Sequence, residues 1–283
     1  MSIQRISLDL VQEEFPDHNL TDHLDSGGQK DVFVGEWRGE EIVLKTVIVD
    51  SYEASRRAKR EVEAMEKINS NTLVDLKQSF PATINDHELL VMVEEFVSGQ
   101  TLREHLNNNG PSVNLGFDVA ETLLTVLQEF NEKSMVHRDI KPENIMITPD
   151  GETKLLDVGI VRMLNEEGLT PTARSSAPGT TKYSAPEQLN NDKEKQDTRT
   201  DIFSTGIVMA ECMTGNHPFN AVDLPVQEAI HTGEWLELEG ELDMPISEHL
   251  GYFLDFMLSP NMNERFNNPE QALKQLTEIR DRI

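Results

Sequence analysis

The chain has 283 residues, of which 37% are hydrophobic and 27% are charged, a composition typical of a folded globular protein rather than a disordered one. Its 51 acidic and 25 basic residues give a formal charge of −26. This charge disfavours nucleic acid and anionic membranes as partners, and it favours basic partners. A solvated surface that promotes solubility, or adaptation to a salty cell, would explain the same charge more simply.

The sequence predicts neither a membrane-spanning segment nor an N-terminal signal peptide. The longest apolar run, residues 202–215, is shorter than the roughly 20 residues that cross a bilayer, and it contains Glu211. The N-terminus lacks the apolar centre of a signal peptide. The single cysteine, Cys212, cannot form an internal disulfide, and we expect it to be a small buried hydrophobe. These features predict a cytoplasmic protein with no membrane partner.

The first hundred residues predict a small sheet with one helix. Short segments rich in valine, isoleucine and aromatic residues alternate there with glycine-containing turns, as in antiparallel strands. Apolar residues at three- and four-residue spacing predict a helix over 51–68. The predicted strands are residues 18–25, 31–39, 41–49, 72–80 and 87–97.

The rest of the chain is predicted to be mainly helical. A strand hairpin over 144–158, with Asp150-Gly151 as its turn, interrupts the helices. An α+β protein with a sheet-rich lobe (1–97) and a larger helical lobe (98–283) follows, and a ligand between two such lobes is the default expectation. The predicted helices are residues 102–108, 115–135, 197–215 and 269–283.

The segment "HRDIKPEN", His137 to Asn144, resembles the catalytic loop of protein kinases. The resemblance extends from about Asn19 to the C-terminus, and the order of the elements also agrees. It implies a two-lobed protein-kinase-like fold, with an antiparallel sheet and one helix in the N-lobe and helices in the C-lobe. It also implies transfer of the ATP γ-phosphate to a protein hydroxyl.

The resemblance assigns roles to the charged residues of this loop. Phosphoryl transfer depends mainly on positioning and on charge neutralisation. Asp139 would orient the acceptor hydroxyl and take its proton, and Lys141 would offset the phosphate charge. Asn144 and Asp157 would supply oxygen ligands to Mg²⁺, with Mn²⁺ as an alternative. A charged surface loop is the alternative for any one of these residues, but eight consecutive matches argue against it.

In the N-lobe the resemblance implies an ATP site built around Lys45. This lysine matches the one that holds the α- and β-phosphates, and Glu61 is its expected partner; Glu63 would face away on the same helix. An ordinary surface lysine and a solvated helix face are the alternatives. The other expected nucleotide contacts are Val32, Val43, Glu95, Val97 and Met146.

The predicted phosphate loop, "DSGGQKDV", departs from the family pattern G-x-G-x-x-G-x-V. Glycine lets backbone N–H groups approach phosphate closely, but the first and third glycines are replaced here by Asp25 and Lys30. Lys30 would add a favourable charge near the phosphates, and Asp25 an unfavourable one. We interpret the loop as working but altered, against the alternative of a simple hairpin. The loop comprises Asp25, Ser26, Gly27, Gly28, Gln29, Lys30, Asp31 and Val32.

Two further departures concern the interior of the site. Val158 replaces the aromatic residue of the Asp-Phe-Gly motif. Because the valine side chain is smaller, it buries less apolar area, and we expect it to hold the active arrangement less strongly. Glu94 occupies the position that controls the back pocket. It could pair with Lys45 or Arg60 or point to water, and the sequence does not choose among these.

The segment "GTTKYSAPE", residues 179–187, resembles the end of a kinase activation segment. The resemblance implies that Glu187 forms a buried ion pair with Arg265 and that Asp201 anchors the catalytic loop. Small-molecule kinases of this fold typically lack the segment, so a protein substrate is favoured. Lys141 and Thr180 resemble serine/threonine kinases in particular.

A regulatory hypothesis rests on Arg138, which in the family often holds a phosphorylated activation segment. We expect autophosphorylation at Thr172, Ser175 or Ser176 through transient self-association, against the alternative of an unmodified loop. The acidic charge and Glu143 suggest basic residues near the acceptor. A pseudokinase scaffold that binds nucleotide without transfer is the main alternative function, and a small-molecule kinase is the other.

Overall fold

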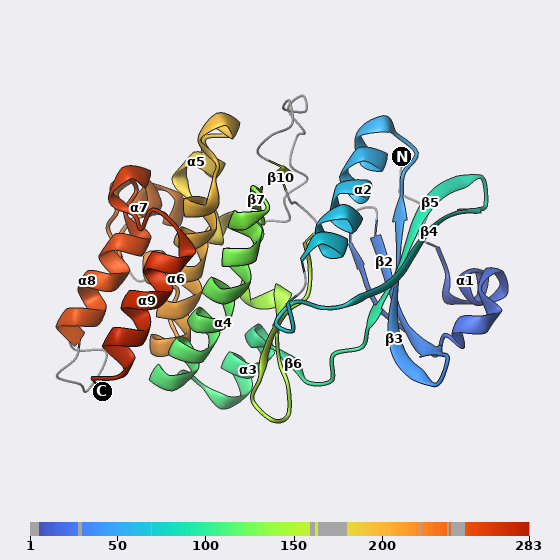
Figure 1. Ribbon diagram of the computed structural model, residues 1–283, viewed down its shortest axis with the longest axis horizontal. Coiled ribbons are helices and arrows are strands. Elements are labelled where there is room, and N and C mark those ends of the chain that lie inside the picture. The colour runs from blue at the N-terminus through green and yellow to red at the C-terminus, as the bar shows by residue number, and fades with distance from the viewer. Residues whose placement is uncertain are drawn as a thin grey trace. The chain divides into compact units, whose positions relative to one another are not determined.

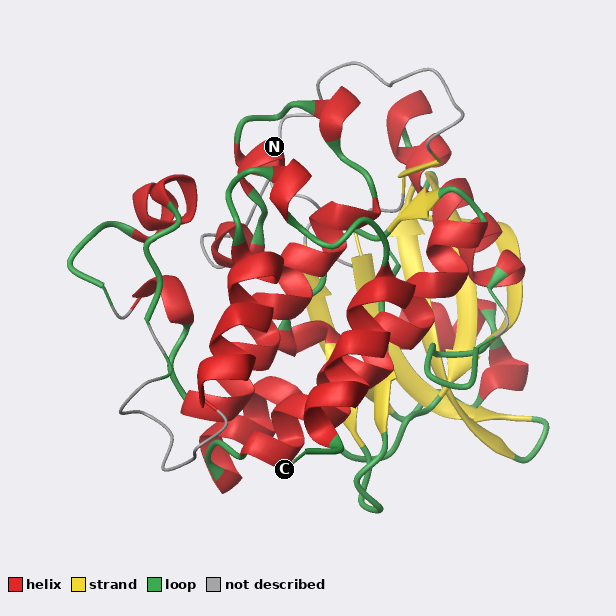
Figure 2. Cartoon of the chain, turned by 60° about the vertical axis from the view of Figure 1, so that its left-hand side comes forward, coloured by secondary structure: helices red, strands yellow, loops and turns green. Residues whose placement is uncertain are grey.

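The computed structural model describes residues 6–27, 30–68, 70–158, 162–163, 180–220, 222–236, 238 and 247–282. The chain divides into two compact units, one formed mainly by Met1–Ser98 and the other by residues from Gly99 onward (Figure 1). Unit 1 is built around a sheet, and unit 2 is built mainly from helices (Figure 2). The α+β class predicted from the sequence is confirmed.

Unit 1 contains a five-stranded antiparallel sheet in the order β1-β2-β3-β5-β4. Two-residue turns join β2 to β3 and β4 to β5, and both residues of each turn have positive φ, as tight hairpins require. The first pair is Arg38-Gly39, and the second is Asn85-Asp86. The strands are β1 (Asp22–Gly27), β2 (Lys30–Trp37), β3 (Glu40–Ile48), β4 (Leu76–Ile84) and β5 (His87–Glu95).

The N-terminal part of unit 1 differs from the sequence-based prediction in two ways. A strand was expected from residue 18, but Pro16–His18 form a 3-10 turn and β1 starts only at Asp22. The sequence analysis also omitted α1 (Leu8–Glu14), a helix capped by the Ser7 hydroxyl. Its Val11 packs in one apolar cluster with one face of the sheet, formed by Phe33, Ile42, Leu44, Val91 and Val93.

The helix predicted over 51–68 is α2 (Tyr52–Lys67). The Ser51 hydroxyl accepts a hydrogen bond from the Ala54 N–H and so caps its first turn. Its apolar stripe is buried, and Glu61 is buried on the same helix. The apolar stripe therefore faces the interior of the protein, and the Glu61 carboxylate is buried beside it.

Unit 2 is organised around α6, whose residues are almost all buried. Gly206 of α6 allows α8 to approach, because a Cβ there would lie 2.8 Å from the Met257 Cβ. Cys212 on α6 is buried, as the sequence predicted. The helices are α3 (Leu102–Asn109), α4 (Val113–Glu132), α5 (Pro186–Leu189), α6 (Thr198–Thr214), α7 (Val226–Thr232), α8 (Ser247–Leu258) and α9 (Pro269–Arg280).

Short strands in unit 2 carry the predicted hairpin. β8 pairs with β9, and Gly151 has a φ of +87° in the turn between them, which glycine adopts readily. None of the helices in the described parts of the chain is long and apolar enough to span a membrane. The strands are β6 (Gln100–Thr101), β7 (Met135–Val136), β8 (Ile145–Ile147), β9 (Thr153–Leu155) and β10 (Arg162–Met163).

Candidate active site

The predicted catalytic loop in unit 2 is anchored by Asp201 of α6. The two carboxylate oxygens of Asp201 accept hydrogen bonds from the backbone N–H groups of His137 and Arg138, both at 2.7 Å. Burial raises the pKa of Asp201 to about 7, although these two N–H donors act in the opposite direction. The carboxylate thus fixes the backbone just before Asp139.

Arg138 adopts a left-handed backbone conformation, with a φ of +68°, which costs energy for a residue with a Cβ. Hydrogen bonds to neighbouring segments hold it there. Besides the Asp201 bond, its carbonyl accepts from Gln188 Nε2 at 3.0 Å, and its Nη1 donates to Gln196 Oε1 at 3.2 Å. The strained turn directs the chain into the predicted catalytic residue.

The structure brings Asp139, Lys141 and Asn144 together. Asp139 Oδ2 accepts from Lys141 Nζ at 2.8 Å and from Asn144 Nδ2 at 2.9 Å. Asn144 Nδ2 also lies 3.0 Å from the Asp139 carbonyl. Because its amide nitrogen is used in these bonds, its Oδ1 is the atom left to act as a ligand.

Asp157 follows β9, and a backbone hydrogen bond of the preceding residue connects it to the predicted catalytic loop. The Leu156 N–H donates to the Asn144 carbonyl at 2.9 Å, so the backbone around Asp157 is tied to Asn144. A carboxylate and an amide oxygen are the hard ligands that Mg²⁺ prefers, and the two residues fit this ion. The next residue, Val158, is buried.

In unit 1 the strand register places three of the predicted nucleotide residues, Val32, Val43 and Lys45, on one face of the sheet together with Glu94. Val32 lies opposite Lys45, and Val43 lies opposite Glu94, so all four side chains share a face. Glu95 ends β5, and its carboxylate accepts from the Asp75 N–H at 3.0 Å. Val97 follows β5 in unit 1, whereas Met146 belongs to β8 of unit 2, where it pairs with Thr101.

Lysine side chains on this face pair with carboxylates. Lys45 Nζ lies 2.6 Å from Glu94 Oε2, so the pairing with Lys45, one of the alternatives that the sequence left open for Glu94, is observed. Lys30 Nζ lies 3.1 Å from Glu61 Oε1. The sequence had suggested Glu61 as a partner for Lys45, and it had assigned Lys30 no partner.

The predicted phosphate loop forms the end of the β1–β2 hairpin. Asp25 pairs with Val32, Ser26 with Asp31 and Gly27 with Lys30 across the two strands. Asp25 is exposed. Gly28 and Gln29 lie outside the described residues, as does the side chain of Ser26.

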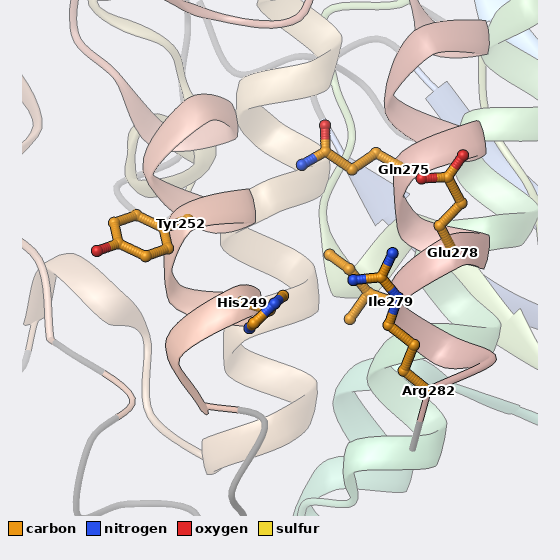
Figure 3. Close-up of a pocket in the computed structure, with 6 residues that line it drawn as sticks. All are labelled: His249, Tyr252, Gln275, Glu278, Ile279 and Arg282. Carbon is orange, nitrogen blue, oxygen red and sulfur yellow. The ribbon is translucent and has the colours of Figure 1, made fainter.

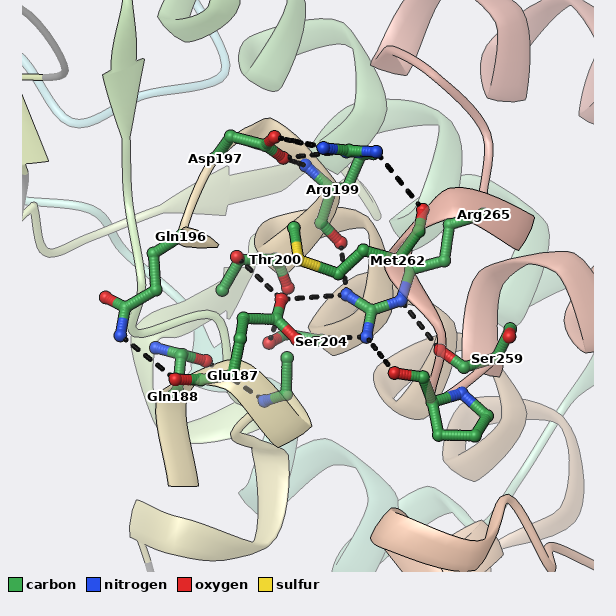
Figure 4. A network of polar contacts seen from close by, with 12 residues as sticks. Glu187, Gln188, Gln196, Asp197, Arg199, Thr200, Ser204, Ser259, Met262 and Arg265 are labelled. Carbon is green, nitrogen blue, oxygen red and sulfur yellow. Dashed lines mark hydrogen bonds and ion pairs between the residues drawn. The ribbon is translucent and has the colours of Figure 1, made fainter. Parts of the chain in front are cut away.

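Glu187 and Arg265 form a buried, two-pronged ion pair (Figure 4). Arg265 Nη1 and Nη2 donate to the two Glu187 oxygens at 2.8 and 3.0 Å, and the Thr200 hydroxyl adds a bond of 2.8 Å. Arg265 also donates to the carbonyls of Ser259 and Arg199. This network joins the end of the activation segment to α6 and to the loop before α9.

A second polar network, which the sequence analysis missed, centres on Arg103 of α3. Arg103 donates to Glu143 in the catalytic loop at 3.0 Å, to Glu211 of α6 at 2.8 Å, and to the Tyr183 hydroxyl. Tyr183 in turn donates to Glu211 at 2.6 Å. These residues come from four separate segments, so no local pattern in the sequence marks them as a group.

His217 packs edge-on against Tyr183, with the ring centroids 5.1 Å apart. Burial lowers the pKa of His217 to about 4. Its Nε2 lies 3.1 Å from the Lys182 carbonyl, which suits a neutral ring that donates from this nitrogen.

The predicted phosphorylation sites Thr172, Ser175 and Ser176 lie outside the described residues. Thr180 begins the 3-10 turn Thr180–Tyr183, and its side chain is likewise not described. A pocket of about 300 Å³ lies between α8 and α9 (Figure 3), and none of the predicted site residues lines it. Its lining residues are His249, Tyr252, Gln275, Glu278, Ile279 and Arg282.

Comparison with known proteins agrees with this geometry. Residues 21–276 match the model of the protein kinase domain. The chain belongs to the protein kinase family. This kinase domain is similar to a probable serine/threonine-protein kinase of Streptomyces coelicolor, with 33% identity over 68% of this chain and 28% of the relative.

Other bacterial relatives show the same level of similarity to this kinase domain. A probable serine/threonine-protein kinase of Clostridium acetobutylicum is 31% identical over 84% of this chain and 35% of its own length. The serine/threonine-protein kinase PknB of Mycobacterium tuberculosis is 29% identical over 79% and 34%. The chain therefore spans about a third of the length of these relatives.

Proposed function

We propose that this kinase domain transfers the γ-phosphate of ATP to serine or threonine hydroxyls of protein substrates. The observation that carries the proposal is the convergence of Asp139, Lys141 and Asn144 on a loop anchored by Asp201. The bacterial relatives are named serine/threonine kinases, which supports the same class.

In this proposal Asp139 orients the acceptor hydroxyl and takes its proton as the oxygen attacks the γ-phosphorus. Lys141, already 2.8 Å from Asp139, offsets negative charge on the transferred group. Asn144 and Asp157 would hold Mg²⁺, or Mn²⁺, which neutralises the phosphate oxygens when bound. Lys45, as the sequence suggests, would bind the remaining phosphate charge through its ammonium group. Lys30 would add a second ammonium group beside it.

The partners in this proposal are protein substrates, and the activation segment is the proposed site of regulation. Autophosphorylation at Thr172, Ser175 or Ser176, by transient self-association, would place phosphate within reach of the Arg138 guanidinium. The suggestion of basic residues near the acceptor is weakened, because Glu143 already pairs with Arg103. Mass spectrometry of active protein tests the regulation; a preparation without phosphate at these positions would contradict it.

The central test is transfer from labelled ATP, with Mg²⁺, to the protein itself and to a generic protein substrate. Asp139→Asn keeps the side-chain shape but removes the proton acceptor. We expect transfer by the wild type and a loss of about 100-fold or more in the variant. Nucleotide binding without transfer by the wild type would instead favour a pseudokinase.

A further inference from the structure

Residues 6–20, which we call the N-terminal strap, cover one face of the sheet in unit 1 (Figure 1). The strap contains α1 and the 3-10 turn Pro16–His18. Its residues Ile6, Val11 and Leu20 are buried in the apolar cluster that they form with the strands. The match to the protein kinase domain begins only at residue 21. The strap is therefore a feature of this chain that the family match does not explain.

A glycine of β2 brings the C-terminal part of the strap close to the sheet. A Cβ at Gly35 would collide with the His18 carbonyl oxygen, so this position requires glycine. Gln12 of α1 accepts a hydrogen bond from the Leu20 N–H and donates to the Pro16 carbonyl at 3.4 Å. These bonds tie α1 to the segment that follows it, so the strap is fixed as one piece.

The N-terminal end of the strap meets a buried carboxylate. The Ile6 N–H donates to Asp31 Oδ2 at 3.3 Å, and His23 Nε2 lies 3.6 Å from Asp31 Oδ1. Asp31 is only 5% exposed. A carboxylate removed from water in this way needs hydrogen-bond donors or a positive charge close by. The strap supplies one of these donors from its backbone.

Asp31 connects the strap to the predicted phosphate loop. On β2 it follows Lys30 directly, and it lies opposite Ser26 of β1 and Thr46 of β3. Successive side chains of a strand point to opposite faces, so Asp31 points towards the strap while Lys30 and Val32 point towards the predicted nucleotide face. A movement of the strap would therefore shift the backbone that carries both of these residues.

We propose that the N-terminal strap, acting through the Ile6 N–H and Asp31, holds the β1–β2 hairpin in the position in which its end binds the ATP phosphates. Asp31 is a positioning residue in this arrangement, because its side chain lies on the face of the sheet opposite the predicted nucleotide face. The inference rests on the proposed function, since it needs an ATP site at this loop. It goes further by making ATP affinity depend on a segment outside the matched domain.

The first test compares two substitutions of one residue. Ile6→Pro and Ile6→Ala both reduce the apolar area of this side chain, but only proline removes the backbone N–H. We expect the dissociation constant for ATP to be about 2- to 30-fold higher in Ile6→Pro than in Ile6→Ala, the range of coupling between linked sites. We expect kcat at saturating ATP to change little, because the predicted catalytic residues of unit 2 are untouched. A contribution to folding alone would lower the melting temperature of Ile6→Pro without this split between affinity and kcat.

A double-mutant cycle with Asp31→Ala assigns the effect to the hydrogen bond rather than to the proline ring. Because each substitution removes the same bond, the double variant should bind ATP only about as weakly as the weaker-binding single variant. Asp17→Ala is the matched control, since Asp17 is an exposed carboxylate in the 3-10 turn of the strap, and it should bind ATP as the wild type does. Single effects that multiply in the double variant would overturn the inference.

The second test uses the wild type and follows amide hydrogen exchange by mass spectrometry. Coupling between two sites is reciprocal, so a strap that favours ATP binding must itself be stabilised by ATP. Saturating ATP with Mg²⁺ should slow exchange in residues 6–20, and Ile6→Pro should abolish this protection. The helix α9 of unit 2 serves as the internal reference. Exchange in the strap that is the same with and without bound ATP would overturn the inference.

These measurements separate the inference from the proposed function. A wild type that binds ATP and transfers phosphate, but shows neither the Ile6→Pro effect nor the protection of the strap, would overturn the inference alone. A wild type that neither binds ATP nor transfers phosphate would overturn both. Weaker ATP binding in Ile6→Pro, together with protection of the strap in the wild type, would support the inference.

Discussion

Replacing Glu187 by glutamine measures how strongly the buried pair with Arg265 stabilises unit 2. The Arg265 side chain is fully buried and that of Glu187 is 4% exposed, so neither charge is compensated by water. Glu187→Gln keeps the shape and one acceptor oxygen, but it removes the negative charge and turns one guanidinium N–H towards an amide NH₂ group. The backbone carbonyls of Ser259 and Arg199, at 2.7 and 3.0 Å, do not replace that charge. Breaking a buried pair in this way costs about 3–5 kcal/mol.

Urea unfolding provides the assay, and the two tryptophans allow the units to be followed separately. Trp37 lies in unit 1 and Trp235 in unit 2, so fluorescence in a Trp37→Phe background reports on unit 2. The expected loss corresponds to a fall in melting temperature of roughly 10 °C. The variant should unfold at a lower urea concentration with an unchanged slope.

Glu121→Gln is the matched control for this prediction. Glu121 pairs with Arg280 at 2.6 Å, but both side chains are about 30% exposed, at 29% and 34%. Exposed pairs contribute about 0–1 kcal/mol, so this identical chemical change should have a small effect. Equal losses in Glu187→Gln and Glu121→Gln would refute the reasoning from burial.

Three further outcomes are expected in unit 2. Asp201→Asn leaves one backbone N–H of the predicted catalytic loop facing an amide nitrogen. We expect the free energy of unfolding in urea to fall by about 1–3 kcal/mol and phosphate transfer to decrease. Unchanged transfer would contradict the anchoring role. Burial lowers the pKa of His217 to about 4, so between pH 4 and about 6.5 the unfolded chain binds a proton that the folded chain does not. The stability that His217 contributes above pH 6.5 is therefore lost as the pH falls towards 4, by about 1.4 kcal/mol per pH unit. His217→Gln should remove that dependence, and identical pH profiles of unfolding would exclude it. Arg103→Met removes the bonds to Glu143 and Glu211 and should cost about 2 kcal/mol by the same assay, whereas a loss no larger than in Glu121→Gln would show the network to be unimportant.

Local patterns were sufficient to predict most of the elements and the catalytic loop. The helix over 51–68 shows a regular apolar spacing, and the hairpin at Asp150-Gly151 has a typical turn pair, so both were predicted close to their observed bounds. The eight residues from His137 are contiguous, and their identity alone indicated what the loop resembles. The omission of α1 was avoidable, because Ser7 followed by Leu8, Leu10 and Val11 is a capped apolar pattern.

The charge pairs could not be predicted in the same way. Whether Glu94 meets Lys45 depends on the register of β3 against β5, which no single strand specifies. Whether Glu61 meets Lys30 depends on where α2 packs on the sheet. The Arg103 network likewise requires four segments to be folded first, so residue identity alone did not reveal it.

Because Cys212 is buried, its thiol can report how often unit 2 opens. The thiol lies in α6 at the centre of unit 2, and burial raises its pKa, so it is protected from alkylating reagents in the folded state. It is also the single cysteine of the chain. Its rate of modification therefore measures how often unit 2 exposes α6, and any cysteine introduced on the surface can be labelled without competition from a native thiol.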